Sequence, residues 1–84
     1  MTNDELTRKV SNASEMILSV KGKRFTICEE DEKEGFSIAQ WNKPDTERYF
    51  ANAKELVDSY QIDGKTLGEC AGEIRIEDYT GYDA

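Results

Sequence analysis

The residues that could perform chemistry in this chain are two cysteines and a dense set of carboxylates. Eighteen of the 84 residues are Asp or Glu, Cys28 and Cys70 are the two cysteines, and histidine is absent. Histidine is the most common general base, and a nucleophilic cysteine usually depends on such a base. Neither cysteine lies in a motif that lowers a thiol pKa, such as two cysteines separated by two residues. The sequence therefore predicts reduced structural thiols, no catalytic residue and no enzymatic activity.

The densest acidic segment spans residues 29–34, where five carboxylates surround Lys33 and Gly35 follows. A calcium loop alternates its ligands and places a glycine at its sixth position, and this nearly contiguous run does not have that spacing. The scattered glycines also lack the pattern of a phosphate-binding loop. We therefore predict no metal site and no cofactor. A run of this charge cannot be buried, so it predicts an exposed hairpin tip whose candidate partner-binding residues are Glu29, Glu30, Asp31, Glu32 and Glu34.

Three aromatic residues complete the set of candidate contacts. Trp41 is expected at the end of a strand, and Tyr79 and Tyr82 are expected beyond the last strand. Exposed aromatic side chains often anchor protein interfaces, so these three are candidate partner-binding residues. Packing over the edge of the sheet is the alternative, structural role for them.

The charge limits the kind of partner. The formal net charge is −7, and nucleic acids and anionic membranes both attract positive surfaces. We therefore expect another protein as the partner, with no direct binding of nucleic acid or membrane. No apolar run approaches the ~18 residues of a membrane span, and the acidic first residues differ from a signal peptide, so we expect a cytoplasmic location.

The elements that must position these residues begin with a helix. Thr2 and Glu5 form a capping-box pattern, and Leu6, Val10 and Ala13 recur at helical spacing, so a helix is expected from about Asn3 to Ala13. A hairpin is then favoured, with strands at 16–20 and 23–28 around a turn at 21–22, and with Val20 facing Lys23. An extension of the helix through residues 16–20 stays open as the alternative.

The middle of the chain predicts a strand at 36–40, a loop at 42–46 and a second helix. Asp45 or Thr46 would cap that helix. Its core stripe would contain Phe50, Ala53, Leu56, Val57 and Tyr60.

The last third of the chain predicts a turn at 62–65, a second capping box formed by Thr66 and Glu69, and a strand at 73–77. Residues 80–84 are expected to be a mobile tail, so that residues 1–79 form one domain. The fold class is therefore α+β: an antiparallel sheet of about four strands, one amphipathic helix packed on one face, and a short N-terminal helix. The order of the strands does not follow from the sequence.

Three segments carry a resemblance to known proteins: 21–27 (KGKRFTI), 36–42 (FSIAQWN) and 62–67 (IDGKTL). In these segments the chain resembles small, acidic, uncharacterised proteins of Gram-positive gut bacteria and of their mobile elements and phages. The resemblance implies a bacterial or phage origin and a role in binding host or competitor proteins, as anti-defence inhibitors do. It implies no catalytic residue.

The functional hypothesis is a non-enzymatic protein–protein interaction module, such as an inhibitor or accessory factor from a mobile element. One alternative is a mimic of nucleic-acid phosphates that blocks a DNA-binding protein. A second alternative is a self-assembling structural component, and the sequence does not resolve whether the chain is a monomer or a homodimer.

Overall fold

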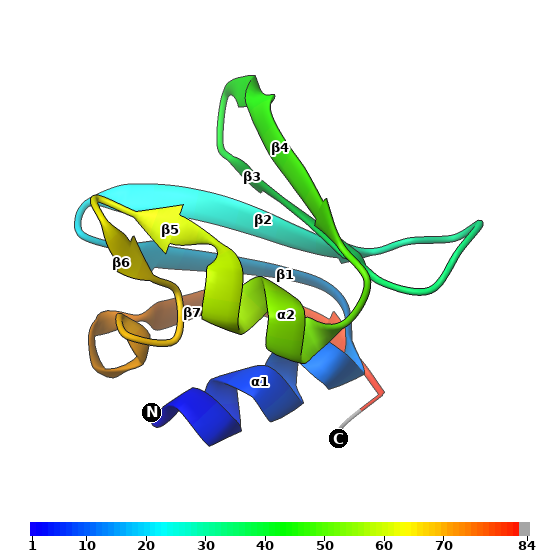
Figure 1. Ribbon diagram of the computed structural model, residues 1–84, viewed down its shortest axis with the longest axis horizontal. Coiled ribbons are helices and arrows are strands. Elements are labelled where there is room, and N and C mark those ends of the chain that lie inside the picture. Colours follow the sequence, from blue (N-terminus) through cyan, green and yellow to red (C-terminus); the bar gives the residue numbers. More distant parts are fainter. Residues whose placement is uncertain (83–84) are drawn as a thin grey trace.

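The computed structural model describes residues 1–82 and contains a five-stranded antiparallel sheet in the order β4-β3-β2-β1-β7 (Figure 1). A two-stranded hairpin, β5-β6, lies beside it. The elements are α1 (Asn3–Asn12), β1 (Ala13–Val20), β2 (Lys23–Glu29), β3 (Phe36–Gln40), β4 (Lys43–Phe50), α2 (Ala53–Ser59), β5 (Gln61–Ile62), β6 (Lys65–Thr66), the 3₁₀ helix η1 (Ala71–Glu73) and β7 (Arg75–Gly81). The predicted α+β class is confirmed, with five strands in the main sheet instead of about four.

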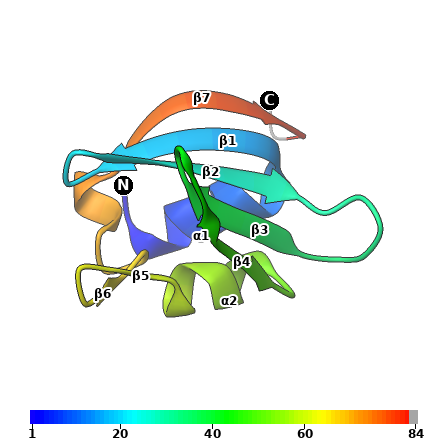
Figure 2. The same cartoon turned by 90° about the horizontal axis from the view of Figure 1, so that it is seen from above.

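Both helices pack on the same face of this sheet, and the sheet curves around them (Figure 2). The apolar core lies between the two layers. Its largest fully buried side chains come from both helices, from the sheet and from the segment after β6: Leu6, Val10, Met16, Leu18, Phe25, Ile27, Ile38, Leu56, Val57, Leu67 and Cys70. One face of the sheet is therefore committed to the core, and the other face is not covered by either helix.

Helix α1 begins as the sequence predicts. The Thr2 hydroxyl accepts a hydrogen bond from the Glu5 backbone N–H, and the Glu5 carboxylate accepts one from the Thr2 N–H. These two bonds satisfy backbone donors that a helix start leaves unpaired. Leu6 and Val10 are fully buried, so they form the stripe that faces the core.

The β1-β2 hairpin confirms the expected register, including Val20 opposite Lys23. Lys21 and Gly22 have φ angles of 54° and 75°, the left-handed conformation that a two-residue hairpin turn requires. Residues 16–20 are thus strand, which settles the alternative that the sequence left open. The alternation places Met16, Leu18 and Val20 of β1 and Phe25 and Ile27 of β2 on the helix side.

The predicted loop at 42–46 and the predicted start of the second helix are wrong. Residues 43–50 form strand β4, which pairs with β3. Asn42 at φ 62° turns the chain, and the Thr46 hydroxyl accepts from the Gln40 N–H and donates to the Lys43 carbonyl. The Thr46 side chain therefore closes a tight hairpin instead of capping a helix. Pro44 is compatible with this position because β4 is an edge strand.

Helix α2 is correspondingly shorter than predicted. Its cap is Asn52, whose side chain accepts a hydrogen bond from the Glu55 N–H at 2.8 Å. Ala53, Leu56 and Val57 form its buried stripe. Phe50 belongs to β4 and Tyr60 follows the helix as its C-cap, so these two residues precede and follow the helix in the sequence and are not part of its stripe.

The end of the chain also differs from the prediction. The Thr66–Glu69 capping box is present, and it opens a turn that leads into η1. The final strand starts at Arg75 and continues to Gly81, beyond the predicted end at 77. Thr80 and Gly81, predicted to be tail, are held by pairing with β1. The rest of the predicted tail includes Tyr82, which is described below, and positions 83–84, which lie outside the described residues.

Candidate interaction surface

The acidic loop, residues 29–34, projects from the end of the β2-β3 hairpin (Figure 1). Its ends are joined by a hydrogen bond from the Glu30 N–H to the Gly35 carbonyl at 3.0 Å. The Tyr49 hydroxyl donates to the Glu34 carbonyl, and the ammonium group of Lys33 lies 3.9 Å from the centre of the Tyr49 ring. The loop is thus exposed, as predicted, and its base is anchored to β4.

Tyr82 connects the far end of the chain to this loop. Its hydroxyl donates to the Glu29 carboxylate at 2.9 Å, and its backbone N–H donates to the Asn12 carbonyl. The hydrogen bond to the Glu29 carboxylate, together with the negative charge of that group, raises the pKa of the Tyr82 phenol. The Tyr82 ring is 72% exposed, so it forms part of the same surface as the acidic loop.

The other two predicted aromatic contacts lie elsewhere. Trp41 follows β3 at the end opposite the acidic loop, is 48% exposed and carries the Arg24 guanidinium 4.6 Å from its ring centre. Tyr79 lies within β7 on the side that faces the helices, where its hydroxyl donates to the Lys9 carbonyl. Tyr79 therefore packs between strand and helix, which is the structural alternative considered for it.

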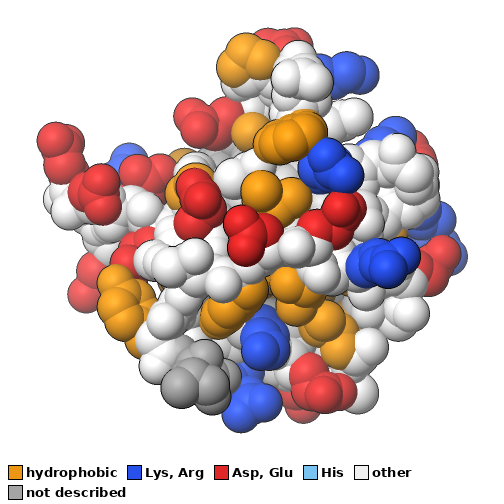
Figure 3. All heavy atoms as spheres, turned by 180° about the vertical axis from the view of Figure 1, so that it is seen from behind, with side chains coloured by type: hydrophobic (Ala, Val, Ile, Leu, Met, Phe, Trp, Pro, Cys, Tyr) orange, Lys and Arg blue, Asp and Glu red, His pale blue; other side chains and the backbone are white. Residues whose placement is uncertain are grey.

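The surface that the sequence did not identify is the face of the sheet opposite the helices, here called the outer face. Cross-strand neighbours define it: Ile17, Thr26 and Ala39 form one row, and Glu15, Cys28, Ser37 and Tyr49 form the next. Figure 3 shows this side of the molecule, with apolar side chains interleaved with charged ones and acidic side chains gathered on the projecting loop. The outer face and the acidic loop are thus continuous.

One end of the outer face is crossed by charged side chains. Arg24 pairs with Glu77 at 3.0 Å while it stacks on Trp41, which links β2, β3 and β7. Hydrogen bonds from Ser19 and Arg24 lower the pKa of Glu77, so its carboxylate stays ionised. These contacts hold the Trp41 ring against the sheet.

Cys28 lies half-buried on the outer face. Its thiol is 3.8 Å from a carboxylate oxygen of Glu15. Burial, followed by the negative charge of Glu15, raises the pKa of the Cys28 thiol. A protonated thiol is a weak nucleophile, so this environment disfavours covalent chemistry at Cys28. Cys70 is fully buried in the core.

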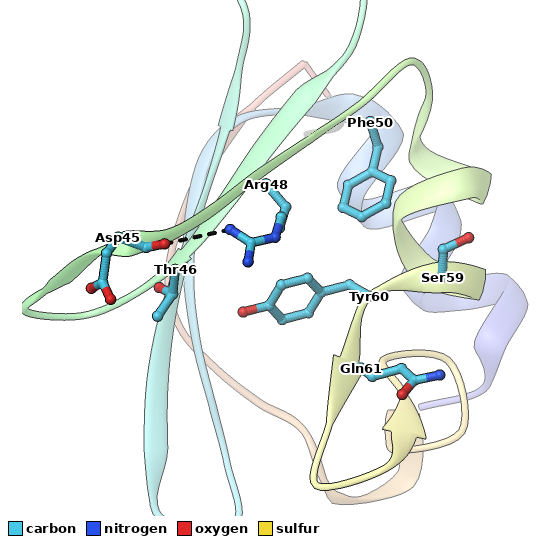
Figure 4. A pocket seen from close by; sticks show the side chains of 7 residues that line it. All are labelled: Asp45, Thr46, Arg48, Phe50, Ser59, Tyr60 and Gln61. Atoms are coloured by element: carbon cyan, nitrogen blue, oxygen red, sulfur yellow. Dashed lines mark hydrogen bonds between the residues drawn. The ribbon is translucent and has the colours of Figure 1, made fainter.

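A second surface feature is a groove of about 460 Å³ between β4 and the residues that leave α2 (Figure 4). It is lined by Asp45, Thr46, Arg48, Phe50, Ser59, Tyr60 and Gln61. Tyr60 makes edge-to-face contacts with Phe25 and Phe50, at 6.0 Å and 6.4 Å between ring centres. Burial raises the pKa of the Tyr60 phenol, so the hydroxyl is a donor at neutral pH.

Within residues 1–82, no group of three or more His, Cys, Asp or Glu side chains is arranged to hold a metal ion. In the same part of the chain, neither helix has the length and apolar character of a membrane span. Comparisons with protein-family models, with curated proteins and with solved structures found no match for this chain.

Proposed function

We propose that this chain is a non-catalytic module that binds another protein through the outer face and the adjoining acidic loop. The observation that carries the proposal is that the helices cover only one of the two faces of the sheet. Both helices pack on one face, whereas the outer face presents half-buried apolar side chains and exposed rings, among them Ile17, Trp41 and Tyr49. Apolar residues framed by polar ones are typical of a protein interface.

The charge of this surface indicates the chemistry of the partner. The acidic loop carries five carboxylates and one lysine, and Glu15, Glu47 and Asp78 extend the negative charge along the outer face. Complementary charge across an interface speeds association and excludes wrong partners. The expected partner is therefore a protein with an apolar patch bordered by Lys and Arg.

The alternative of a nucleic-acid mimic has less support. Arg24, Arg75 and Lys33 interrupt the carboxylates of the outer face and the acidic loop, so the acids do not form an unbroken row like that of a phosphate backbone. The aromatic rings on this side also favour an interface with an apolar component.

The test compares two variants that carry the same change in net charge. One neutralises the acidic loop (Glu30→Gln, Asp31→Asn, Glu32→Gln and Glu34→Gln), and the control neutralises acids of the helix layer (Asp4→Asn, Glu55→Gln, Asp58→Asn and Glu73→Gln). The tagged proteins are used to capture partners from a bacterial lysate, and bound proteins are quantified by mass spectrometry. We expect a partner that the native protein and the control both retain and that the loop variant loses.

Equal retention by both variants would remove the acidic loop from the proposal. Release of the partner by added DNA would overturn it in favour of the phosphate mimic. Retention of untagged copies of this chain as the main bound protein would overturn it in favour of self-assembly.

A further inference from the structure

The groove beside β4 contains a guanidinium group that is held in place but is not neutralised. Nη1 of Arg48 donates to the carbonyl oxygens of Glu47 at 2.7 Å and of Asp45 at 3.4 Å. Within residues 1–82, Arg48 takes part in none of the ion pairs, although the chain has a net charge of −7. Two backbone contacts therefore fix the guanidinium, and its other N–H groups stay available as donors.

Tyr60 supplies a second donor on the opposite wall. Its hydroxyl points toward the opening between Thr46 and Arg48 (Figure 4), and it forms no hydrogen bond with any other residue of the described part. The contacts with Phe25 and Phe50 hold the ring in one orientation. The groove thus presents a positive donor and a neutral donor from two separate elements, and aromatic carbon lines the space beneath them.

The charge and the planar shape of the Arg48 guanidinium favour one class of ligand. A carboxylate matches the planar fork of a guanidinium and requires one positive charge. A phosphate group carries more negative charge than one arginine can neutralise, and the net charge of the chain repels it further. The Asp45 carboxylate points away from the Arg48 guanidinium in Figure 4, so it does not occupy the position of the ligand.

We propose that the groove between β4 and Tyr60 binds a carboxylate attached to a small apolar group, with the guanidinium of Arg48 and the hydroxyl of Tyr60 as its donors. The apolar part lies against the rings of Phe50 and Tyr60. This site is separate from the outer face, because Arg48 and Phe50 point to the helix side of β4 whereas Tyr49 points to the other side. The C-terminus of a peptide and a free organic acid share this chemistry.

The experiment is an NMR titration of the ¹⁵N-labelled protein. The probes are N-acetylphenylalanine, its uncharged amide, the peptide acetyl-Ala-Ala-Phe with a free carboxylate, and inorganic phosphate. The readouts are the Nε–H signal of Arg48 and the backbone amides of residues 45–50 and 59–61. We expect saturable shifts with the two carboxylates, and no saturable shift with the amide or phosphate. Tighter binding of the peptide would identify a peptide terminus as the source, and equal binding would identify a free acid.

Variants separate the proposed donors from the general effect of charge. Arg48→Gln should weaken binding at least about tenfold, and Tyr60→Phe, which keeps the ring, should weaken it about three- to tenfold. Arg75→Gln removes the same charge from the outer face and is the matched control, which should bind as the native protein does. The proposal is overturned if the native protein gives no saturable shift, if the amide binds as well as the acid, or if Arg75→Gln and Arg48→Gln weaken binding equally.

Discussion

Single residues define the start of α1 and the turn that leads into η1, because the interactions involved are local. Thr2 with Glu5, and Thr66 with Glu69, each form the reciprocal bonds that their spacing predicts. A capping box spans four residues, so no knowledge of the tertiary structure is needed to recognise it. The same holds for Leu56, whose place on the apolar stripe of α2 follows from helical periodicity.

Replacement of Leu56 by Asp tests that stripe. Leu56 is fully buried in the core, so the new carboxylate would be buried without a partner, and we expect a loss of roughly 3–5 kcal/mol in the free energy of unfolding. Urea denaturation measures it. The control is Leu56→Met, which nearly conserves volume and should cost less than about 1.5 kcal/mol. Equal costs for the two variants would contradict the buried position.

At the scale of elements, the sequence predicted the strands and helices whose apolar pattern is compatible with only one type of secondary structure. The β1-β2 hairpin was predictable in register because one turn aligns Met16, Leu18 and Val20 with Phe25 and Ile27 on one face. Strand β4 was not, because most of its residues are polar and exposed, and it has no apolar alternation to recognise. Its pairing depends on β3 and on the Thr46 hydroxyl, which are tertiary contacts.

The candidate site was predictable to a similar extent. The acidic loop could be located from charge alone, since such a run is exposed in any fold. The outer face could not, because its members come from five strands whose order the sequence leaves open. Arg48 and Tyr60 were missed for a related reason: Tyr60 was assigned to the core stripe of a helix, and Arg48 fell within the same predicted helix.

Gly35 controls how the acidic loop joins the sheet. Its φ is 126°, and a Cβ atom at this position would collide with the Phe50 carbonyl and the Tyr49 ring. We expect Gly35→Ala to cost about 1–3 kcal/mol for the backbone conformation alone, with the collision added. Gly64→Ala is the control, since Gly64 has φ 84° and open space around it. Thermal unfolding of both variants measures the difference, and a smaller effect at Gly35 than at Gly64 would contradict the close packing.

At the scale of the whole molecule, acid should destabilise the fold. Hydrogen bonds from Thr2 to Glu5, from Thr66 to Glu69, and from Ser19 and Arg24 to Glu77 lower the pKa of each carboxyl below its ordinary value of 4.5. At a pH between the lowered pKa values and 4.5, the unfolded chain therefore binds more protons than the folded chain. The stability that these three groups contribute is therefore fully present above the ordinary value and is lost as the pH falls through the lowered pKa of each group.

Urea denaturation between pH 7 and pH 2 measures this dependence. Glu69→Gln should flatten the decline below pH 4.5, because the variant has no carboxylate at that capping box. The control, Glu73→Gln, removes an exposed carboxylate outside the capping boxes and should change the curve less. A native protein whose stability rises as the pH falls through this range would contradict the prediction.

The pairing of β1 with β7 also determines how the molecule responds to force. Ala13 lies opposite Gly81, and the strands are antiparallel, so the chain enters one strand and leaves the other at the same end of the sheet. Tension applied between Ala13 and Gly81 would therefore peel β7 from β1, starting at that end. In this geometry the hydrogen bonds break one after another instead of sharing the load in shear. The β1-β7 pair should therefore yield to a weak pull on these two residues, however well the core resists heat or urea.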